Sequence, residues 1–258
     1  MQTTMNTAIT REVSRSILNC ELTHLERSPI DMALVHQQHR KYEETLQELG
    51  LTVISLPEEP NLPDAVFVED AAIVLDECAI ITRPGAESRR AETASIAAAL
   101  TPYRKLFTVQ PPGTVDGGDV LTIGKNIYIG MTTRSNQSAI DQMQEFLRPY
   151  GYTVHGVPVS GCLHLKSAIT QVAEATLLIN PAWVDRRYFD GMKFIEVEPS
   201  EPYAANALMV SDVVLYQPAY PKTRQRLEAA GIPLVLVDQS ELAKAEGALT
   251  CCSLIFKV

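Results

Sequence analysis

The sequence is poor in the features that mark a membrane, secreted or metal-binding protein. It has no apolar run close to the roughly 20 residues that a membrane-spanning helix needs, and no basic head followed by an apolar stretch at its start. Its five cysteines are scattered, and no two have C-x-x-C spacing, so neither a disulfide framework nor a zinc ribbon is indicated. We therefore expect reduced thiols, a cytoplasmic location and no metal site.

Positive charge is also scarce. The chain has 22 lysines and arginines against 31 aspartates and glutamates, a formal net charge of -9, and its arginines stand singly or in pairs. Such a field repels a phosphate backbone, and no stripe of arginines offsets it, which argues against a nucleic-acid partner. A small cationic molecule suits this charge better.

No linker or low-complexity tract divides the 258 residues. Four segments share one pattern, a short apolar strand, a turn containing Arg or Pro, and a polar amphipathic helix; they begin AIITRPG, NIYIGMT, TLLINPA and VVLYQPA. A fifth helix lies in PIDMALVHQQHRKYEETLQELG, and Gly50, Gly151 and Gly231 stand where a left-handed glycine ends a helix. This repetition predicts an α/β fold of about five units closed into one pseudo-symmetric domain, residues 1–258.

Carboxylates occur in two unusual segments. NLPDAVFVEDAAIVL contains Asp64, Glu69 and Asp70, and the last two lie inside what reads as a buried strand, where a charge must be paired or must bind something. GTVDGGDVLTIG places Asp116 and Asp119 on either side of two glycines, which allow a ligand to approach closely. Taken alone, the first segment is explained equally well by a loop carboxylate, and the second is better explained by a tight turn.

Histidine and cysteine occur in two other strand-like segments. GCLHLKSAIT places His164 between two leucines, which predicts a strand with the imidazole on one face. Such a histidine is more often a hydrogen-bonded core residue than a catalyst, but a thiol close in space would make a nucleophile and base pair. ALTCCSLIFKV places Cys251 and Cys252 before the final apolar run, where strand alternation would turn only the first thiol toward the axis.

Arginines follow two of the predicted strands. Arg83, Arg89 and Arg90 lie in ITRPGAESRR, and Arg134 lies in GMTTRSN. Surface salt bridges are their ordinary role, but an arginine just beyond a strand end can bind a carboxylate with its fork of donors. Carboxylates that hold a guanidinium and arginines that hold an α-carboxylate together favour an arginine-like substrate.

Five motifs taken together resemble one known family. FVEDAAIV, ITRPGAESRR, TVDGGDVL, LHLKS and LTCCSL are similar to the motifs of dimethylarginine dimethylaminohydrolase, of the guanidino-modifying (pentein) superfamily, and they occur in order between residues 64 and 253. The resemblance implies a five-bladed propeller of ββαβ units, which agrees with the repeat count. It also implies an amidine hydrolase that converts asymmetric dimethylarginine and monomethylarginine to L-citrulline and the methylated amine.

The resemblance implies roles for the residues at the reacting end of the substrate. Cys251 would be the nucleophile and His164 the general acid and base. Asp116 stands where the family has an acidic residue that orients the histidine or holds the guanidinium. Asp70, with Glu69, would match the segment that binds the guanidinium.

Further roles concern the amino-acid end of the substrate. Arg89 and Arg134 match a clamp for the α-carboxylate. Asp64 and the backbone near Leu22 would receive the α-amino group, and Phe67 would line the pocket. The stretch NCELTHLERSPID matches the family's flexible lid only loosely.

The implied chemistry needs no metal or organic cofactor. The thiolate of Cys251 attacks the guanidinium carbon, His164 protonates the leaving amine, and water activated by His164 hydrolyses the thiouronium intermediate. The alternatives are an arginine deiminase, although that family usually has a longer chain with a helical insertion, another guanidine hydrolase, or a non-catalytic propeller that binds a partner. The sequence leaves open which guanidine is preferred and whether the protein is a homo-oligomer.

Overall fold

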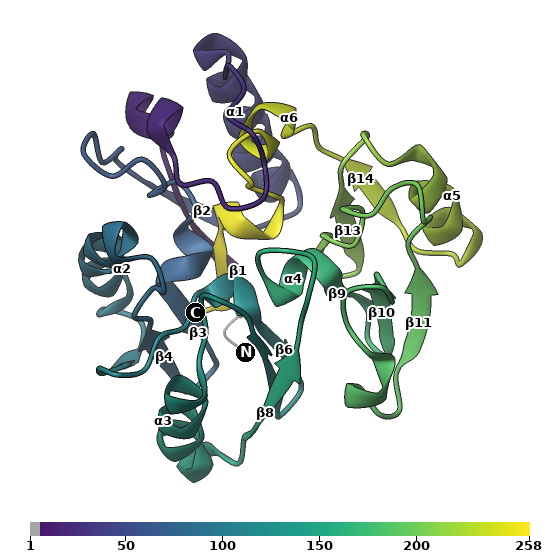
Figure 1. Ribbon diagram of the computed structural model, residues 1–258. Coiled ribbons are helices and arrows are strands. Elements are labelled where there is room, and N and C mark those ends of the chain that lie inside the picture. Colours follow the sequence, from purple (N-terminus) through teal and green to yellow (C-terminus); the bar gives the residue numbers. More distant parts are fainter. Residues whose placement is uncertain (1–5) are drawn as a thin grey trace.

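The computed structural model describes residues 6–258, which form five small sheets arranged around a common centre (Figure 1). Each sheet has three strands, and its middle strand pairs antiparallel with one neighbour and parallel with the other. Because parallel neighbours need a crossover connection, each unit reads strand, strand, crossover, strand. The predicted five-bladed propeller of ββαβ units is confirmed.

Four of the sheets are built from consecutive strands. They are β3 (Ala72–Val74), β4 (Cys78–Ile81) and β5 (Lys105–Thr108); β6 (Val120–Ile123), β7 (Asn126–Met131) and β8 (Thr153–Pro158); β9 (Ile169–Ala173), β10 (Thr176–Ile179) and β11 (Lys193–Glu196); and β12 (Leu208–Val210), β13 (Val213–Tyr216) and β14 (Leu234–Leu236).

The remaining sheet joins the two ends of the described chain. In it β1 (Asn6–Arg11) pairs in parallel with β2 (Thr52–Leu56) and antiparallel with β15 (Leu254–Lys257). The last strand therefore closes the ring, and the residues just before it are brought to the centre of the propeller (Figure 1).

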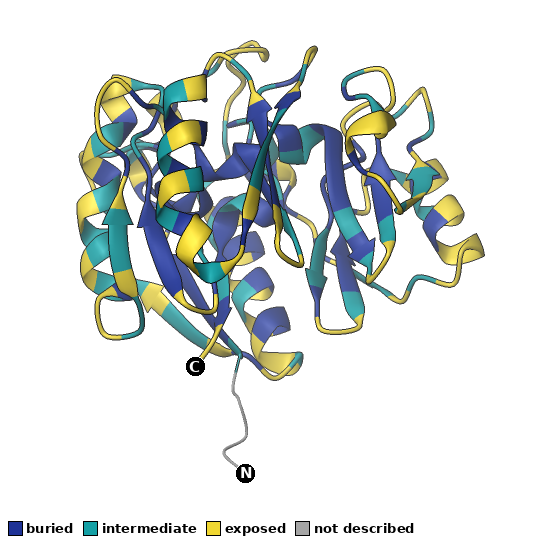
Figure 2. Ribbon diagram, turned by 90° about the horizontal axis from the view of Figure 1, so that it is seen from below, coloured by how far each residue is buried: buried dark blue, intermediate teal, exposed yellow. Residues whose placement is uncertain are grey.

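Most helices lie on the outside of the ring (Figure 1). The crossover helices are α1 (Met32–Glu48), α2 (Thr93–Leu100), α3 (Gln137–Leu147) and α5 (Pro221–Ala229), and α4 (Leu165–Ala168) and α6 (Ser240–Ala243) are single turns. Figure 2 shows the strands buried between these helices, whose outer faces are exposed. Among residues 6–258, no helix is both long and apolar enough to cross a membrane.

The helices predicted from local sequence signals form in four units and fail in one. Gly50, Gly151 and Gly231 have φ of +86°, +77° and +76°, as expected of glycines that end helices. The helix expected after TLLINPA is only a 3₁₀ turn, Arg186–Tyr188. Phe189, which follows the turn, is 1% exposed, and its burial between the sheet and its neighbours ends the turn there.

Candidate active site

The chemically interesting side chains lie on short helical turns that lead into the inner strands. These turns are η2 (Val68–Ala71) before β3, η4 (Gly117–Asp119) before β6, α4 before β9, and η7 (Thr250–Cys252) just before β15. All four converge at one end of the central axis, where η2 contacts both η4 and η7, and α4 contacts η4.

The strands predicted around Asp70 and His164 were wrong. Asp70 lies on η2 and His164 is the residue that precedes α4, whereas Cys251 lies on η7, just before the final strand β15, as expected. Their apolar neighbours are buried because the whole turn is enclosed by the blades, not because the side chains alternate as in a strand. Cys252 is nevertheless buried in the core at 0% exposure, as predicted.

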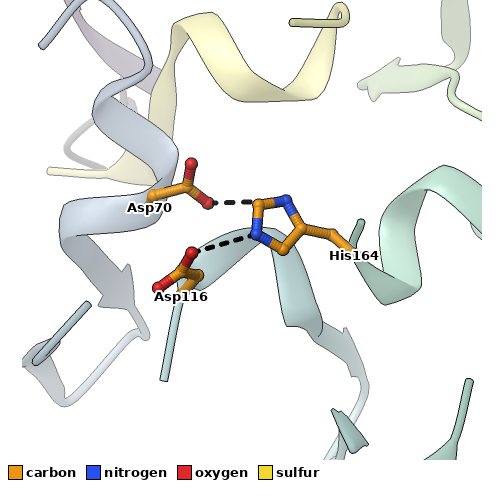
Figure 3. Close-up of side chains that lie close together, drawn as sticks. All are labelled: Asp70, Asp116 and His164. Atoms are coloured by element: carbon orange, nitrogen blue, oxygen red, sulfur yellow. Dashed lines mark hydrogen bonds and ion pairs between the residues drawn. The ribbon is translucent and has the colours of Figure 1, made fainter. Parts of the chain in front are cut away.

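His164 is held between two aspartates (Figure 3). Its Nε2 lies 3.0 Å from Oδ2 of Asp116, and its Nδ1 lies 4.0 Å from Oδ1 of Asp70. Burial opposes protonation of the imidazole, but the negative charges of Asp70, Asp116 and Asp119 outweigh it and raise the pKa of His164 to about 9. The imidazole is therefore a proton donor at neutral pH.

Asp119 fixes the backbone that carries His164. Its Oδ1 accepts a hydrogen bond from the amide of Leu165 at 2.9 Å, and its Oδ2 accepts from the hydroxyls of Ser135 and Thr132. Burial raises the pKa of Asp119 to about 6, against the opposing effects of His164 and these donors. The sequence marked Asp119 as a candidate carboxylate but assigned it no role.

The two glycines of η4 are required by close packing. A Cβ on Gly118 would lie 2.5 Å from Nδ1 of His164, and one on Gly117 would collide with the carbonyl oxygen of Glu69. The amide of Gly118 also donates to Oδ1 of Asp70 at 2.8 Å. Absence of side chains here lets η4 pack directly against the histidine and η2.

Glu69 lies behind the cysteine and is paired on both oxygens. Lys166 forms an ion pair with one, and the hydroxyl of Thr250 donates to the other at 2.8 Å. Burial raises the pKa of Glu69 in spite of these partners. Through Thr250 the carboxylate is tied to the turn that carries Cys251.

Cys251 is positioned by the packing of α1 against the end of the chain. The hydroxyl of Tyr42 donates to the carbonyl of Leu249 at 3.0 Å and accepts from the hydroxyl of Ser253 at 2.7 Å, so the two bonds bracket η7. Burial, followed by the charges of Glu69 and Asp70, raises the pKa of the Cys251 thiol well above its usual range. The thiol is thus neutral in the protein as it stands, and all five cysteines are free.

Cys251 and His164 face one small cavity. The space that a water-sized sphere can occupy is about 20 Å³, close to the volume needed for one water molecule. Its walls are Glu21, Asp64, Phe67, Asp70, Arg89, Arg134, Leu163, His164, Ala245, Glu246 and Cys251. Most of the predicted site residues are therefore brought together, although Asp116 and Glu69 stand behind the wall and Leu22 packs against the core near α1.

Comparison with known proteins bears on this arrangement. The model of the family "N,N dimethylarginine dimethylhydrolase, eukaryotic" matches residues 21–188. The N(G),N(G)-dimethylarginine dimethylaminohydrolase of Pseudomonas aeruginosa is 35% identical over 250 residues, covering 96% of this chain and 98% of that protein. The chain belongs to the dimethylarginine dimethylaminohydrolase family.

Further relatives agree with this assignment. The dimethylarginine dimethylaminohydrolase of Streptomyces coelicolor is 39% identical over 247 residues, which is 95% of each chain. A structure of the Pseudomonas aeruginosa enzyme in complex with citrulline superposes with a TM-score of 0.93 at 34% identity, covering 98% of this chain and 100% of that one. The N-terminal domain of ArgZ, a cyanobacterial arginine dihydrolase, has a TM-score of 0.85 at 19% identity and 97% coverage of both chains, and shares the pentein fold.

The two arginines predicted to bind the α-carboxylate differ in their surroundings. Arg89 is fully engaged: Nη1 donates to Asp70 at 2.6 Å, Nη2 and Nε donate to Glu92, and Nη2 also reaches the carbonyls of Asp64 and Phe67.

Arg134 keeps an unused donor. Its Nη2 donates to the hydroxyl of Thr23 at 3.1 Å, whereas Nη1 is buried with no hydrogen-bond partner among the described residues, 3.7 Å from Oδ2 of Asp116. A buried guanidinium nitrogen without an acceptor is costly, and an incoming carboxylate would satisfy it.

Three further residues were predicted at the amino-acid end of the substrate: Asp64, Phe67 and Leu22. Oδ2 of Asp64 accepts from the amide of Glu21 at 3.0 Å, and burial raises the pKa of Asp64. The ring of Phe67 packs against Gly247, where a Cβ would collide with it. The role given to the backbone near Leu22 stays a prediction, and it is the preceding residue, Glu21, that lines the cavity.

One group in the site has the composition of a metal centre. Asp70, Asp116 and His164 each offer a ligand atom, and these atoms lie within 4.8 Å of one another. Each already has a partner within the cluster or beside it, since Asp116 accepts from the imidazole and Asp70 accepts from Arg89. The ion pairs account for the cluster, and the absence of a metal cofactor stays a prediction.

Proposed function

We infer that the protein hydrolyses NG-methylated L-arginine to L-citrulline and methylamine or dimethylamine. The observation that carries this inference is that Cys251 and His164 line one small cavity together with carboxylates that suit a guanidinium. Membership of the dimethylarginine dimethylaminohydrolase family supports it. We propose that the whole chain, residues 1–258, acts as one catalytic domain.

The first step is formation of the thiolate. Cys251 is a poor nucleophile in the site without substrate, because burial, followed by the charges of Glu69 and Asp70, raises its pKa. A bound guanidinium brings a positive charge beside the sulfur and favours the thiolate. The thiol then releases its proton to solvent, and Sγ forms a bond to the central guanidinium carbon as the carbon–nitrogen double bond becomes a single bond.

The second step is departure of the amine. His164 enters the reaction protonated, since its pKa is about 9, and it donates its proton to the methylated nitrogen as the carbon–nitrogen bond breaks. Asp116 holds the imidazole in place through Nε2. The product of this step is a covalent thiouronium on Cys251.

The third step is hydrolysis of that intermediate. The neutral His164 removes a proton from water, and the resulting hydroxide adds to the same carbon. The carbon–sulfur bond then breaks, the hydroxyl proton passes to the departing sulfur, and neutral citrulline and the thiol of Cys251 are formed. The reacting centre is cationic at the start of each half, so the carboxylate of Asp70 stabilises it better than an oxyanion hole would.

The α-carboxylate and the α-amino group of the substrate need contacts of their own. We propose that Nη1 of Arg134 binds the α-carboxylate and that Asp64 binds the α-amino group. Arg89 would have to release one of its present partners to join the clamp, and Glu69, Phe67 and the backbone near Leu22 keep their supporting roles. The need for a free thiol favours a reducing compartment such as the cytoplasm, and a homo-oligomer remains compatible with this site.

The test is citrulline formation from asymmetric dimethylarginine, monomethylarginine and arginine. Wild type should turn over the methylated substrates, Cys251→Ser should be inactive, and Cys252→Ser, whose thiol is buried in the core, should retain activity. Turnover of arginine alone would make the protein a deiminase. Inactivity of folded wild type on all three would overturn the proposed substrate class and favour a binding role.

A further inference from the structure

One wall of the cavity belongs to a segment that a carboxylate holds in place. Residues 21–25, here called the covering segment, contribute Glu21 to that wall, and three successive backbone amides of this segment point at the side chain of Glu246. Oε1 of Glu246 accepts from Thr23 at 3.0 Å, His24 at 2.5 Å and Leu25 at 2.7 Å, and Oε2 accepts from Thr23 at 3.1 Å. Successive amides directed at one anion form a concave site with strong, charge-assisted bonds.

The covering segment has to move during turnover. The cavity has room for about one water molecule, whereas the substrate must place its guanidinium beside Cys251 and its carboxylate beside Arg134. Glu21 and Glu246 both line the cavity, so the segment and the residue that holds it belong to its outer wall. Entry of substrate and exit of citrulline therefore require these amides to leave Glu246.

The covering segment also touches the residues assigned to the two ends of the substrate. The hydroxyl of Thr23 accepts from Nη2 of Arg134, and the amide of Glu21 donates to Asp64. A movement of the segment therefore changes the surroundings of both residues proposed to bind the ends of the substrate, Arg134 for the α-carboxylate and Asp64 for the α-amino group.

The backbone of Glu246 supports a specific role for its side chain. Its φ is +58°, in the left-handed region that favours glycine or asparagine, and among the described residues only Ser211, with φ of +53°, is another non-glycine residue there. Glycine would relieve this conformation, so the local backbone does not account for a glutamate at this position. The contacts of its carboxylate do.

We propose that Glu246 is a positioning residue that latches the covering segment over the active site. In its latched form the segment restricts access to Cys251, which stays partly exposed, and completes the contacts at the amino-acid end of the substrate. The inference rests on the proposed function for the identity of the substrate, but the latch itself can be measured without turnover.

The first test is alkylation of Cys251 by iodoacetamide at pH 9, followed by mass analysis of the peptide that contains it. Glu246→Gly removes the carboxylate and relieves the backbone, so the fold should be at least as stable while the latch is lost. We expect labelling at least ten-fold faster than in wild type. Ser211→Gly gives the same backbone relief in the exposed turn between β12 and β13, and it should label as wild type does.

The second test is steady-state kinetics on dimethylarginine. Glu246→Gly should raise KM at least ten-fold and change kcat less than three-fold, because Glu246 does not contact the reacting atoms in this scheme. Glu246→Gln keeps one oxygen that can accept and should lie between wild type and Glu246→Gly. Ser211→Gly should leave both constants unchanged.

The two readouts separate the latch from the proposed function. The latch would be overturned if Cys251 were labelled in folded Glu246→Gly at the wild-type rate. It would also be overturned if Glu246→Gly lowered kcat ten-fold and left KM unchanged. Faster labelling in a protein whose wild type is inactive on methylarginines would support the latch and overturn the substrate. Loss of folding in Glu246→Gly, seen as a lower Tm than wild type, would contradict the claim that the side chain is not needed by the backbone.

Discussion

The charge of Asp116 is the feature of the site whose removal has the most direct physical consequence. The substitution Asp116→Asn keeps the size of the side chain and an oxygen that can accept from the amide of Gly85, but it removes the negative charge 3.0 Å from Nε2 of His164. The protonated imidazole is then stabilised by Asp70 and Asp119 alone. We expect the pKa of His164 to fall below the value of about 9 that the intact site maintains.

The free-energy cost of removing the Asp116 charge can be worked out from the pKa of His164. A rise in the pKa of a histidine from 6.5 to about 9 corresponds to about 3 kcal/mol of preferential stabilisation of the charged form. Burial opposes this stabilisation and three aspartates share it, with Asp70 contributing most and Asp116 next. Removal of the charge of Asp116 should therefore cost about 1 to 2 kcal/mol of the interaction.

The sign of the pH dependence is determined by the direction of the shift. Because the folded pKa lies above the unfolded one, protonated His164 stabilises the fold fully below about pH 6.5, and this contribution disappears as the pH rises to about 9. The stability difference between wild type and Asp116→Asn should be larger at pH 6 than at pH 9.5. Urea unfolding at the two pH values measures it, and NMR titration of His164 gives the pKa directly.

A matched control is available in Asp76→Asn, which makes the same change of charge at an exposed turn between β3 and β4. This control should leave the titration of His164 within about 0.3 of wild type, since exposed charges are screened. If Asp116→Asn also left the midpoint unchanged, or if its effect on stability were independent of pH, the account of the cluster would be refuted.

Three further predictions concern the surroundings of the thiol. Lys166→Met leaves the buried carboxylate of Glu69 without its cation and should destabilise the fold by about 3 to 5 kcal/mol in urea unfolding; a loss under about 1 kcal/mol would contradict the pairing. Gly118→Ala places a methyl group 2.5 Å from Nδ1 of His164, so it should displace the imidazole and reduce kcat at least ten-fold. A wild-type kcat in this variant would contradict the expectation. The pH profile of Cys251 alkylation without substrate should rise only above pH 9, because burial, Glu69 and Asp70 raise its pKa; a midpoint near that of free cysteine would show the raised pKa to be wrong.

Much of the architecture could be predicted from local sequence patterns. Apolar strands, polar helices and the glycines at positions 50, 151 and 231 report backbone preferences that depend on a few neighbouring residues, and they predicted the repeated unit. The missing helix of the fourth unit was not readable, because burial of Phe189 between elements distant in sequence decided it. The pairing of β1 with β15 is likewise a contact between the two ends of the described chain.

The active site shows the same difference between what local sequence and what tertiary contacts determine. Its residue types were determined by the sequence, since a thiol, an imidazole and carboxylates in recognisable motifs carry chemistry wherever the chain places them. Only the tertiary structure decided their state: that Asp70 and Asp116 flank His164 and keep it protonated, and that Arg89 donates to carboxylates whereas Nη1 of Arg134 has no hydrogen-bond acceptor among the described residues. Charge, burial and hydrogen-bond supply are set by atoms within a few ångströms in space, and in a ring closed by its last strand those atoms come from every part of the chain.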